Sequence, residues 1–216
     1  RWPVLADGHL WAEGLLLTPP GPPRGAALIL PDADETPEQL SGVAPGLAPQ
    51  RRWGQGLAAA GYVVLIPDMV DRADDWSGHP AVRFTNQPHR EFLYRAGYEM
   101  GRHLLGYEAQ VVLSGADALR EEYGAERPAL LGHGEGGLVT LYVGAADERF
   151  APVLVSGAFG GLQSTWKQPI YRNVFGLLRT FGDAELALMV APRPLLLLDL
   201  QPPAIDGPPP ARDGRS

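Results

Sequence analysis

The segment Ala-Leu-Leu-Gly-His-Gly-Glu-Gly-Gly, residues 129–137, decides the fold class of this chain. Its first three residues are apolar and four of its last six are glycine, which predicts a buried strand followed by a sharp turn. Residues 136–146 follow with the pattern of an amphipathic helix. A strand, a glycine turn and a helix in immediate succession are typical of proteins in which strands and helices alternate.

Five other short apolar runs are predicted to be buried strands, at residues 13–17, 26–30, 62–66, 152–155 and 195–198. These runs are continuous rather than alternating, which is typical of strands covered by helices on both faces. Further helices are predicted at residues 49–60, 89–123 and 182–190. The second of these contains Gly97, Gly101 and Gly106, which are candidate points of interruption.

Strands that alternate with helices predict the doubly wound α/β class, in which a mostly parallel sheet is flanked by helices. We expect one domain over residues 1–200. Residues 201–216 are Pro-rich and are interpreted as a tail or as the start of a truncated segment. Because ligands of this class bind at the carboxyl ends of strands, the loops 31–36, 132–137 and 199–206 are the places to look for chemistry.

The composition excludes several functions. The chain has 216 residues and a formal net charge of −7, which argues against a nucleic-acid partner. No apolar run approaches the roughly 20 residues that span a bilayer. The absence of cysteine removes disulfides and thiolate chemistry but leaves the cellular location undetermined. The chain begins with Arg1 rather than Met, so we expect an excised or processed segment whose partners could include neighbouring domains.

The glycine turn matches two known patterns. As Gly-x-Gly-x-x-Gly, it fits the dinucleotide fingerprint, in which glycines let a pyrophosphate approach a helix N-terminus. That fingerprint needs an acidic residue about 20 positions further on, where this chain has Val155, Ser156 and Gly157. As Gly-x-Ser-x-Gly, the turn fits a nucleophile elbow with Gly134 in the place of the serine. We favour the elbow and expect no cofactor.

In this second form the segment resembles the Gly-His-Ser-x-Gly-Gly elbow of α/β-hydrolases, particularly dienelactone hydrolase-like and acetyl xylan esterase-like proteins. Residues 183–185, with Ala-Pro-Arg-Pro-Leu at 191–195, resemble the helix and strand before the catalytic acid of those esterases. Residues 101–108 resemble their long helix before the elbow. The likeness spans residues 13–198. It implies a carboxylic-ester hydrolase with an α/β-hydrolase fold that lacks the last strand and helix.

Two of the three groups that such an enzyme needs are missing. Ester hydrolysis requires a nucleophilic oxygen, a carboxylate and a histidine, which this family carries in that order along the chain. Gly134 has no side chain, and no histidine follows Asp199. The degenerate elbow consists of Gly132, His133, Gly134, Glu135 and Gly136. It predicts a non-catalytic structural or ligand-binding module. The alternative is an active esterase with a relocated nucleophile or residual oxyanion-hole catalysis.

The resemblance also implies which N–H groups would stabilise an oxyanion. They are the amide of Glu135 and the amide of Ala33 or Asp34, in the loop after the second predicted strand. The carboxylate of Glu135 is expected to point away from the elbow apex. Because Glu135 opens a helix, the helix dipole is the expected reason for its charge.

Several acidic residues lie near the predicted strand ends. The carboxylates of Asp32, Asp34 and Glu35 would repel an oxyanion unless they pointed outward, so we interpret them as part of a capped turn before a helix. Asp199 and Asp206 follow the last strand, where the resemblance places the acid that orients the histidine. Without that histidine, both are interpreted as ordinary loop carboxylates.

One acidic loop contains residue types that can bind a metal ion. Asp71, Asp74, Asp75 and His79 lie within nine residues of one another. Oxygen ligands of this kind suit a hard cation, but the spacing matches no established metal-binding loop. We therefore predict a solvated acidic loop and no bound metal.

Other polar residues are predicted to have structural roles. His103 and His133 are interpreted as structural histidines. Arg102 and Glu108 are six residues apart on a predicted helix, so they cannot face each other and are expected to find other partners.

An aromatic-rich stretch, residues 166–181, follows the fifth strand, and the resemblance implies that it helps to roof the active-site pocket. Its apolar residues recur at helical spacing, which predicts core packing. The alternative is a remnant pocket for a small ester or carbohydrate-like ligand.

Overall fold

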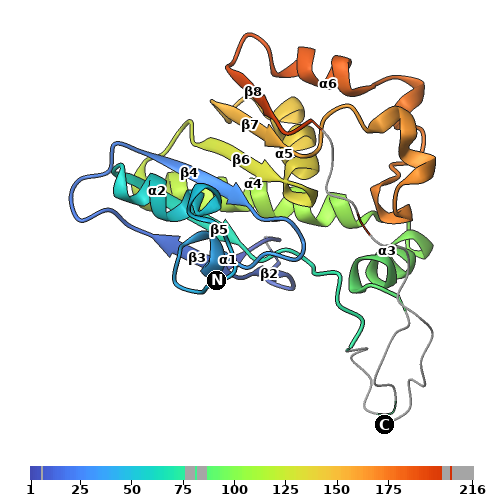
Figure 1. The fold of residues 1–216 in the computed structure, drawn as a ribbon, viewed down its shortest axis with the longest axis horizontal. Helices are drawn as coiled ribbons and strands as arrows, with labels where there is room; N and C mark the ends of the chain where they lie inside the picture. The colour runs from blue at the N-terminus through green and yellow to red at the C-terminus, as the bar shows by residue number, and fades with distance from the viewer. Residues whose placement is uncertain (6, 76–80, 82–86, 201–204, 206–216) are drawn as a thin grey trace.

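A mixed sheet of six strands forms the centre of the computed structural model, which describes residues 1–5, 7–75, 81, 87–200 and 205 (Figure 1). The order across the sheet is β3-β5-β4-β6-β7-β8. The strands are β3 (Gly14–Leu17), β4 (Gly25–Leu30), β5 (Tyr62–Pro67), β6 (Ala129–His133), β7 (Val153–Ser156) and β8 (Leu195–Leu198). Only the β3–β5 pair is antiparallel among these described strands. The predicted α/β class with a mostly parallel sheet is confirmed.

The helices alternate with these strands along the chain. The α-helices are α1 (Pro37–Leu40), α2 (Trp53–Ala59), α3 (His89–Glu99), α4 (Leu104–Tyr123), α5 (Glu135–Ala146) and α6 (Asp183–Val190). The 3-10 helices are η1 (Pro49–Arg51), η2 (Leu162–Lys167), η3 (Ile170–Arg172) and η4 (Leu177–Arg179). Within the described ranges, none of these helices combines the length and the apolar character needed to cross a bilayer.

The sheet has a core on each face because its strands carry apolar side chains in both directions. On one face, Leu28, Leu130 and Val153 pack in a cluster that includes residues of α4 and α5. On the other face, Ile29 and Val64 pack with residues of α1 and α2. Because β4 to β8 run in the same direction, their carboxyl ends lie at one edge of the sheet, where β6 leads into α5 (Figure 1).

The helix predicted at residues 89–123 is two helices, α3 and α4. The chain breaks at Gly101, whose φ of +69° is a backbone conformation that favours glycine. His103 then caps α4, because its Nδ1 accepts the N–H of Leu105 at 3.1 Å. The predicted helical stretch is therefore interrupted, at one of the three glycines named as candidate points of interruption.

Helix α6 begins within one residue of its predicted start. The N–H of Gly182 donates to Glu185 Oε2 at 2.8 Å. Asp183 is buried and accepts the N–H of Leu162 at 3.1 Å. Asp183 therefore ties α6 to η2.

Full helical cover of every strand was predicted, and this is wrong for β8. Leu196 and Leu198 alternate along β8 with side chains that are 45% and 44% exposed, while Leu195 and Leu197 pack against the larger core. The cause is the placement of α1 and α2, whose apolar residues pack over β4 and β5 rather than over β8.

A two-stranded sheet, β1 (Trp2–Pro3) with β2 (Trp11–Ala12), was not predicted. It lies against α4, where the indole N–H of Trp2 donates to Ser114 Oγ at 3.1 Å. Strands of two residues are too short to leave a periodic signal in the sequence.

Candidate functional site

The elbow has the geometry expected of a strand that turns sharply into a helix. Strand β6 ends at His133, α5 begins at Glu135, and Gly134 between them has a φ of +56° and a ψ of −118°. The flanking glycines are required by close packing. A Cβ at Gly132 would collide with the carbonyl of Gly136, and a Cβ at Gly136 would collide with the backbone of Leu30. The turn therefore holds strand and helix in tight contact.

The space above Gly134 is filled by the carboxylate of Asp32. An ideal Cβ built on Gly134 would lie 2.5 Å from Asp32 Cγ, much closer than van der Waals contact. Asp32 Oδ1 also accepts the N–H of Glu135 at 2.8 Å. The expectation that the carboxylates of this loop point outward is therefore wrong for Asp32. This amide was a candidate oxyanion donor, and its hydrogen bond is already used within the chain.

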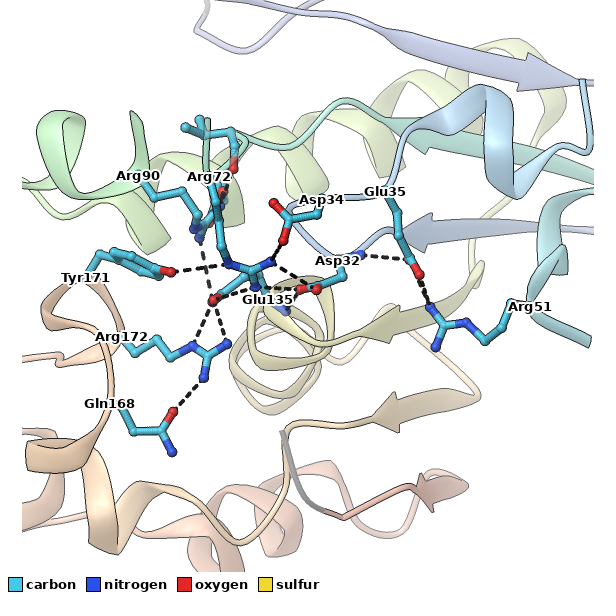
Figure 2. A network of polar contacts seen from close by, with 12 residues as sticks. Asp32, Asp34, Glu35, Arg51, Arg72, Arg90, Glu135, Gln168, Tyr171 and Arg172 are labelled. Carbon is cyan, nitrogen blue, oxygen red and sulfur yellow. Dashed lines mark hydrogen bonds and ion pairs between the residues drawn. The ribbon is translucent and has the colours of Figure 1, made fainter. Parts of the chain in front are cut away.

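Arg72 holds the Asp32 carboxylate in place. Its Nη2 donates to Asp32 Oδ1 at 2.8 Å and its Nη1 donates to Oδ2 at 3.1 Å, so the guanidinium meets both oxygens (Figure 2). Burial opposes the ionisation of Asp32, but Arg72 and the N–H groups of Glu135 and Ala33 outweigh it and lower the pKa of the carboxyl. Asp32 is thus a carboxylate in the folded chain at neutral pH.

The other residues of this loop differ in how far they are exposed to solvent. Ala33 is buried beside Asp32, whereas the Asp34 side chain is 62% exposed and bonds Arg72 Nη1 at 2.5 Å. Glu35 pairs with Arg51 at 2.7 Å. The predicted capped turn is present, because Thr36 forms a capping box with Gln39 at the start of α1.

Glu135 is the centre of a buried ionic cluster, which we call the arginine cluster (Arg72, Arg90, Arg172 and Glu135). Its side chain is fully buried. Its Oε1 accepts from Arg172 Nε at 2.8 Å and from Arg72 Nη2 at 3.0 Å, while Arg90 Nη2 lies 3.9 Å from Oε2. Although burial opposes its charge, the three guanidinium groups lower the pKa of Glu135.

The sequence did not predict this cluster. Glu135 does lie in the first turn of α5, but its charge is stabilised by arginines from three separate segments rather than by the helix dipole alone (Figure 2). Arginines distant in sequence from the elbow leave no local pattern that would point to it.

A second buried ion pair lies next to the cluster. Arg90 donates to both carboxylate oxygens of Glu108, at 2.6 and 2.9 Å, and its guanidinium also lies 5.1 Å from the ring centre of Tyr171. Glu108 therefore has Arg90 as its partner, in agreement with the prediction that Arg102 and Glu108 do not face each other. Burial raises the pKa of Glu108 despite the neighbouring guanidinium.

Side-chain contacts link Asp199, which follows β8, to the ends of β7 and β6. Asp199 has a φ of +45°, and its Oδ2 accepts the hydroxyl of Ser156 at 3.1 Å. Ser156 Oγ lies 2.9 Å from His133 Nδ1. In the tautomer that carries the proton on Nδ1, the imidazole donates to Ser156 while the Ser156 hydroxyl donates to Asp199. Burial and the charge of Arg51 lower the pKa of His133.

The remaining histidines lie elsewhere or outside the described residues. His89 pairs with Asp71 at 2.6 Å, and His103 Nε2 lies 3.1 Å from the carbonyl of Asn173, which fits the structural role predicted for His103. His79 and Asp206 lie outside the described residues. In the ranges that the structure describes, no group of three or more His, Asp or Glu side chains could hold a metal ion.

The aromatic stretch forms 3-10 turns rather than one helix, and its residues divide between the core and the surface. Tyr171 is buried, whereas Trp166 and Phe175 are 78% and 86% exposed. Core packing was therefore a wrong expectation for these two side chains. A cavity of about 30 Å³ lies beside Gly134, lined also by Leu162, Arg172 and other residues of this region.

Comparisons with known proteins identify the fold. No protein-family model matches this chain, and no curated protein matches its sequence. A solved structure from Bacteroides fragilis, provisionally assigned as an acetyl xylan esterase, matches with a TM-score of 0.68 and 18% identity over 84% of this chain and 54% of its own. The chain has the α/β-hydrolase-like fold of these esterases.

Glucuronoyl esterases of carbohydrate esterase family 15 also match. The enzyme from Teredinibacter turnerae has a TM-score of 0.53 and 16% identity over 84% of this chain and 50% of its own. The one from Solibacter usitatus has a TM-score of 0.51 and 20% identity over 84% of this chain and 57% of its own. This chain therefore spans about half the length of the structures that it resembles.

Proposed function

We propose that this chain is an α/β-hydrolase-fold module that does not carry out serine ester hydrolysis and serves as a structural or ligand-binding module. The observation that carries the proposal is the position of Asp32. Its carboxylate takes the space of the missing nucleophile side chain and accepts the amide that would stabilise an oxyanion. A negative charge held there opposes the negative charge that develops during ester hydrolysis.

The ligand we propose is a small ester or a carbohydrate-like molecule. The structural neighbours are named for esters of carbohydrates, and the dienelactone hydrolase-like sequence features point to the same broad class of carboxylic esters. The cavity beside Gly134 is lined by the apolar side chains of Leu138 and Leu162 and by Gln168 and Arg172, and its volume of about 30 Å³ has room for only a few atoms at one end of such a ligand.

An active esterase is the second candidate, because Ser156 provides a hydroxyl next to an imidazole. Its burial weighs against this role. Ser156 is fully buried, so an ester has no access to its hydroxyl, which donates to the carboxylate of Asp199 at 3.1 Å.

The two candidates are separated by a fluorophosphonate probe and by nitrophenyl esters of short acids. We expect no covalent label on the purified chain and no ester turnover above that of the Ser156→Ala variant. Mass spectrometry would locate any label that forms. A label on Ser156 that disappears in Ser156→Ala, together with ester turnover, would establish the esterase and refute the proposal.

A further inference from the structure

The carboxylate of Asp32 has the surroundings of a bound ligand. Arg72 donates to both of its oxygens, and the N–H of Glu135 donates to one of them. Two parallel bonds from a guanidinium, with a backbone amide at a helix N-terminus, are a common way for proteins to recognise a carboxylate. The same donors would suit any small carboxylate of the same shape.

The guanidinium is fixed without help from Asp32. The Arg72 side chain is 9% exposed, and it also donates to Tyr171 Oη at 3.3 Å and to Glu135 Oε1 at 3.0 Å. Asp34 bonds it from the solvent side. Three contacts therefore keep Arg72 in position when the carboxylate at position 32 is removed.

The backbone that carries Asp32 is also fixed independently of its carboxylate. The N–H of Asp32 donates to Glu35 Oε2 at 3.1 Å, and the N–H of Glu35 donates back to the carbonyl of Asp32 at 2.9 Å. Arg51 anchors Glu35. Loss of the Asp32 carboxylate should therefore leave the loop in place and open a small space bounded by Arg72, Gly134 and the amide of Glu135.

We propose that the elbow is a carboxylate-binding site and that Asp32 is its intramolecular ligand. An external carboxylate can enter only where the Asp32 side chain leaves, so binding of such a ligand is coupled to movement of this side chain. Binding at this site uses the Arg72 guanidinium and the N–H of Glu135 and requires no nucleophile, so it is independent of whether the chain hydrolyses esters.

The test removes the Asp32 carboxylate and supplies it from solution. Formate corresponds to the group deleted in Asp32→Ala. We expect the variant to have a lower Tm than the native chain and sodium formate to restore roughly half of the loss in a saturable manner. Sodium chloride at the same ionic strength should restore none of it. A Tm that responds equally to formate and chloride would overturn the proposal.

Matched variants test whether formate raises the Tm by binding at Arg72. Asp34→Ala also removes a partner of Arg72, but on the solvent side, so formate should not change its Tm. Asp32→Asn fills the space with an amide and should likewise be insensitive to formate. In Asp32→Ala/Arg72→Met, formate should have no effect because the guanidinium is absent. A formate effect that persists in this double variant would contradict the assigned site.

The proposal remains testable where Asp32→Ala does not fold in plain buffer. The variant is then refolded from denaturant in formate and, separately, in chloride, and folded protein is measured by circular dichroism and gel filtration. Recovery in formate alone supports the site. Equal recovery in both salts, or recovery in neither, refutes it.

Discussion

The carboxylate of Asp32 lies directly above Gly134, so close that the two positions cannot both carry a side chain in their present geometry. One residue follows β4 and the other follows β6, which are neighbouring parallel strands. Their carboxyl ends lie side by side, and a small change at one position therefore decides what the other can hold. The same contact links the stability of the elbow to the absence of a side chain at position 134.

Gly134→Ser should not restore esterase activity. The new hydroxyl would meet the Asp32 carboxylate, whose oxygens are already bonded by Arg72 and by the N–H of Glu135, and we expect no imidazole to be placed to take the hydroxyl proton. Overpacking typically costs about 1–3 kcal/mol, and the positive φ of +56° adds to the loss for a residue with a side chain. Denaturant titration would measure the loss in stability, and nitrophenyl acetate would measure turnover. Ester hydrolysis by this variant would contradict the account.

Gly134→Ser should be tolerated better when Asp32 is shortened. In Gly134→Ser/Asp32→Gly the clash is gone, so the double variant should be more stable than the sum of the two single effects predicts, by about 1–2 kcal/mol. The four proteins of this double-mutant cycle are compared by urea denaturation. Strict additivity would show that the two positions do not compete for the same space.

Glu135→Gln should destabilise the chain strongly. The substitution keeps the shape of the side chain but leaves three buried guanidinium groups without their shared negative charge. Removing one partner of a buried ionic group typically costs about 3–5 kcal/mol. Glu91→Gln is the matched control, because Glu91 pairs with Arg95 on the exposed side of α3 and such pairs contribute less than about 1 kcal/mol. Similar losses for both variants would refute a central role for Glu135.

Acid should weaken the native chain more than the Asp32→Asn variant. The folded pKa of Asp32 is below its ordinary value of 3.8, so the unfolded chain binds a proton more readily. The stability from this carboxylate is therefore complete above pH 5 or so and decreases as pH falls through 3.8 towards the folded pKa. Urea titrations from pH 6 down to about pH 3 would show a steeper decline for the native chain. The raised pKa of Glu108 gives a contribution to stability with the opposite pH dependence. This contribution is present in both proteins, so it cancels when the native chain is compared with the variant. Parallel declines would contradict the prediction.

His133 should titrate below the ordinary histidine value of 6.5 and be neutral at pH 7. The nearby charges predict opposite changes in two variants. Arg51→Gln removes a positive charge and should raise the pKa of His133, whereas Asp199→Asn removes a negative charge and should lower it further. Two-dimensional NMR of the imidazole would measure all three values. Shifts of the same sign in both variants would refute the assigned surroundings.

The sequence determined the fold class and the position of the elbow, because both depend on local patterns. Continuous apolar runs gave the parallel strands to within two residues, and the glycines of the elbow are demanded by a tight turn that local sequence records. The break between α3 and α4 lies at Gly101, one of three glycines that the sequence marked as candidate interruptions, but the sequence did not distinguish among them. The absence of a side chain at position 134 is read directly from the sequence.

Only the tertiary structure decided what occupies the elbow. Asp32, Arg72 and Glu135 are distant along the chain, and their contacts depend on which strands are neighbours and on how the loops after them fold back. Ion pairs carry no periodicity, so an arginine that joins a buried carboxylate looks the same in sequence as one that faces water. The sequence shows that position 134 has no side chain, but only the packed structure shows that the carboxylate of Asp32 fills the space above it.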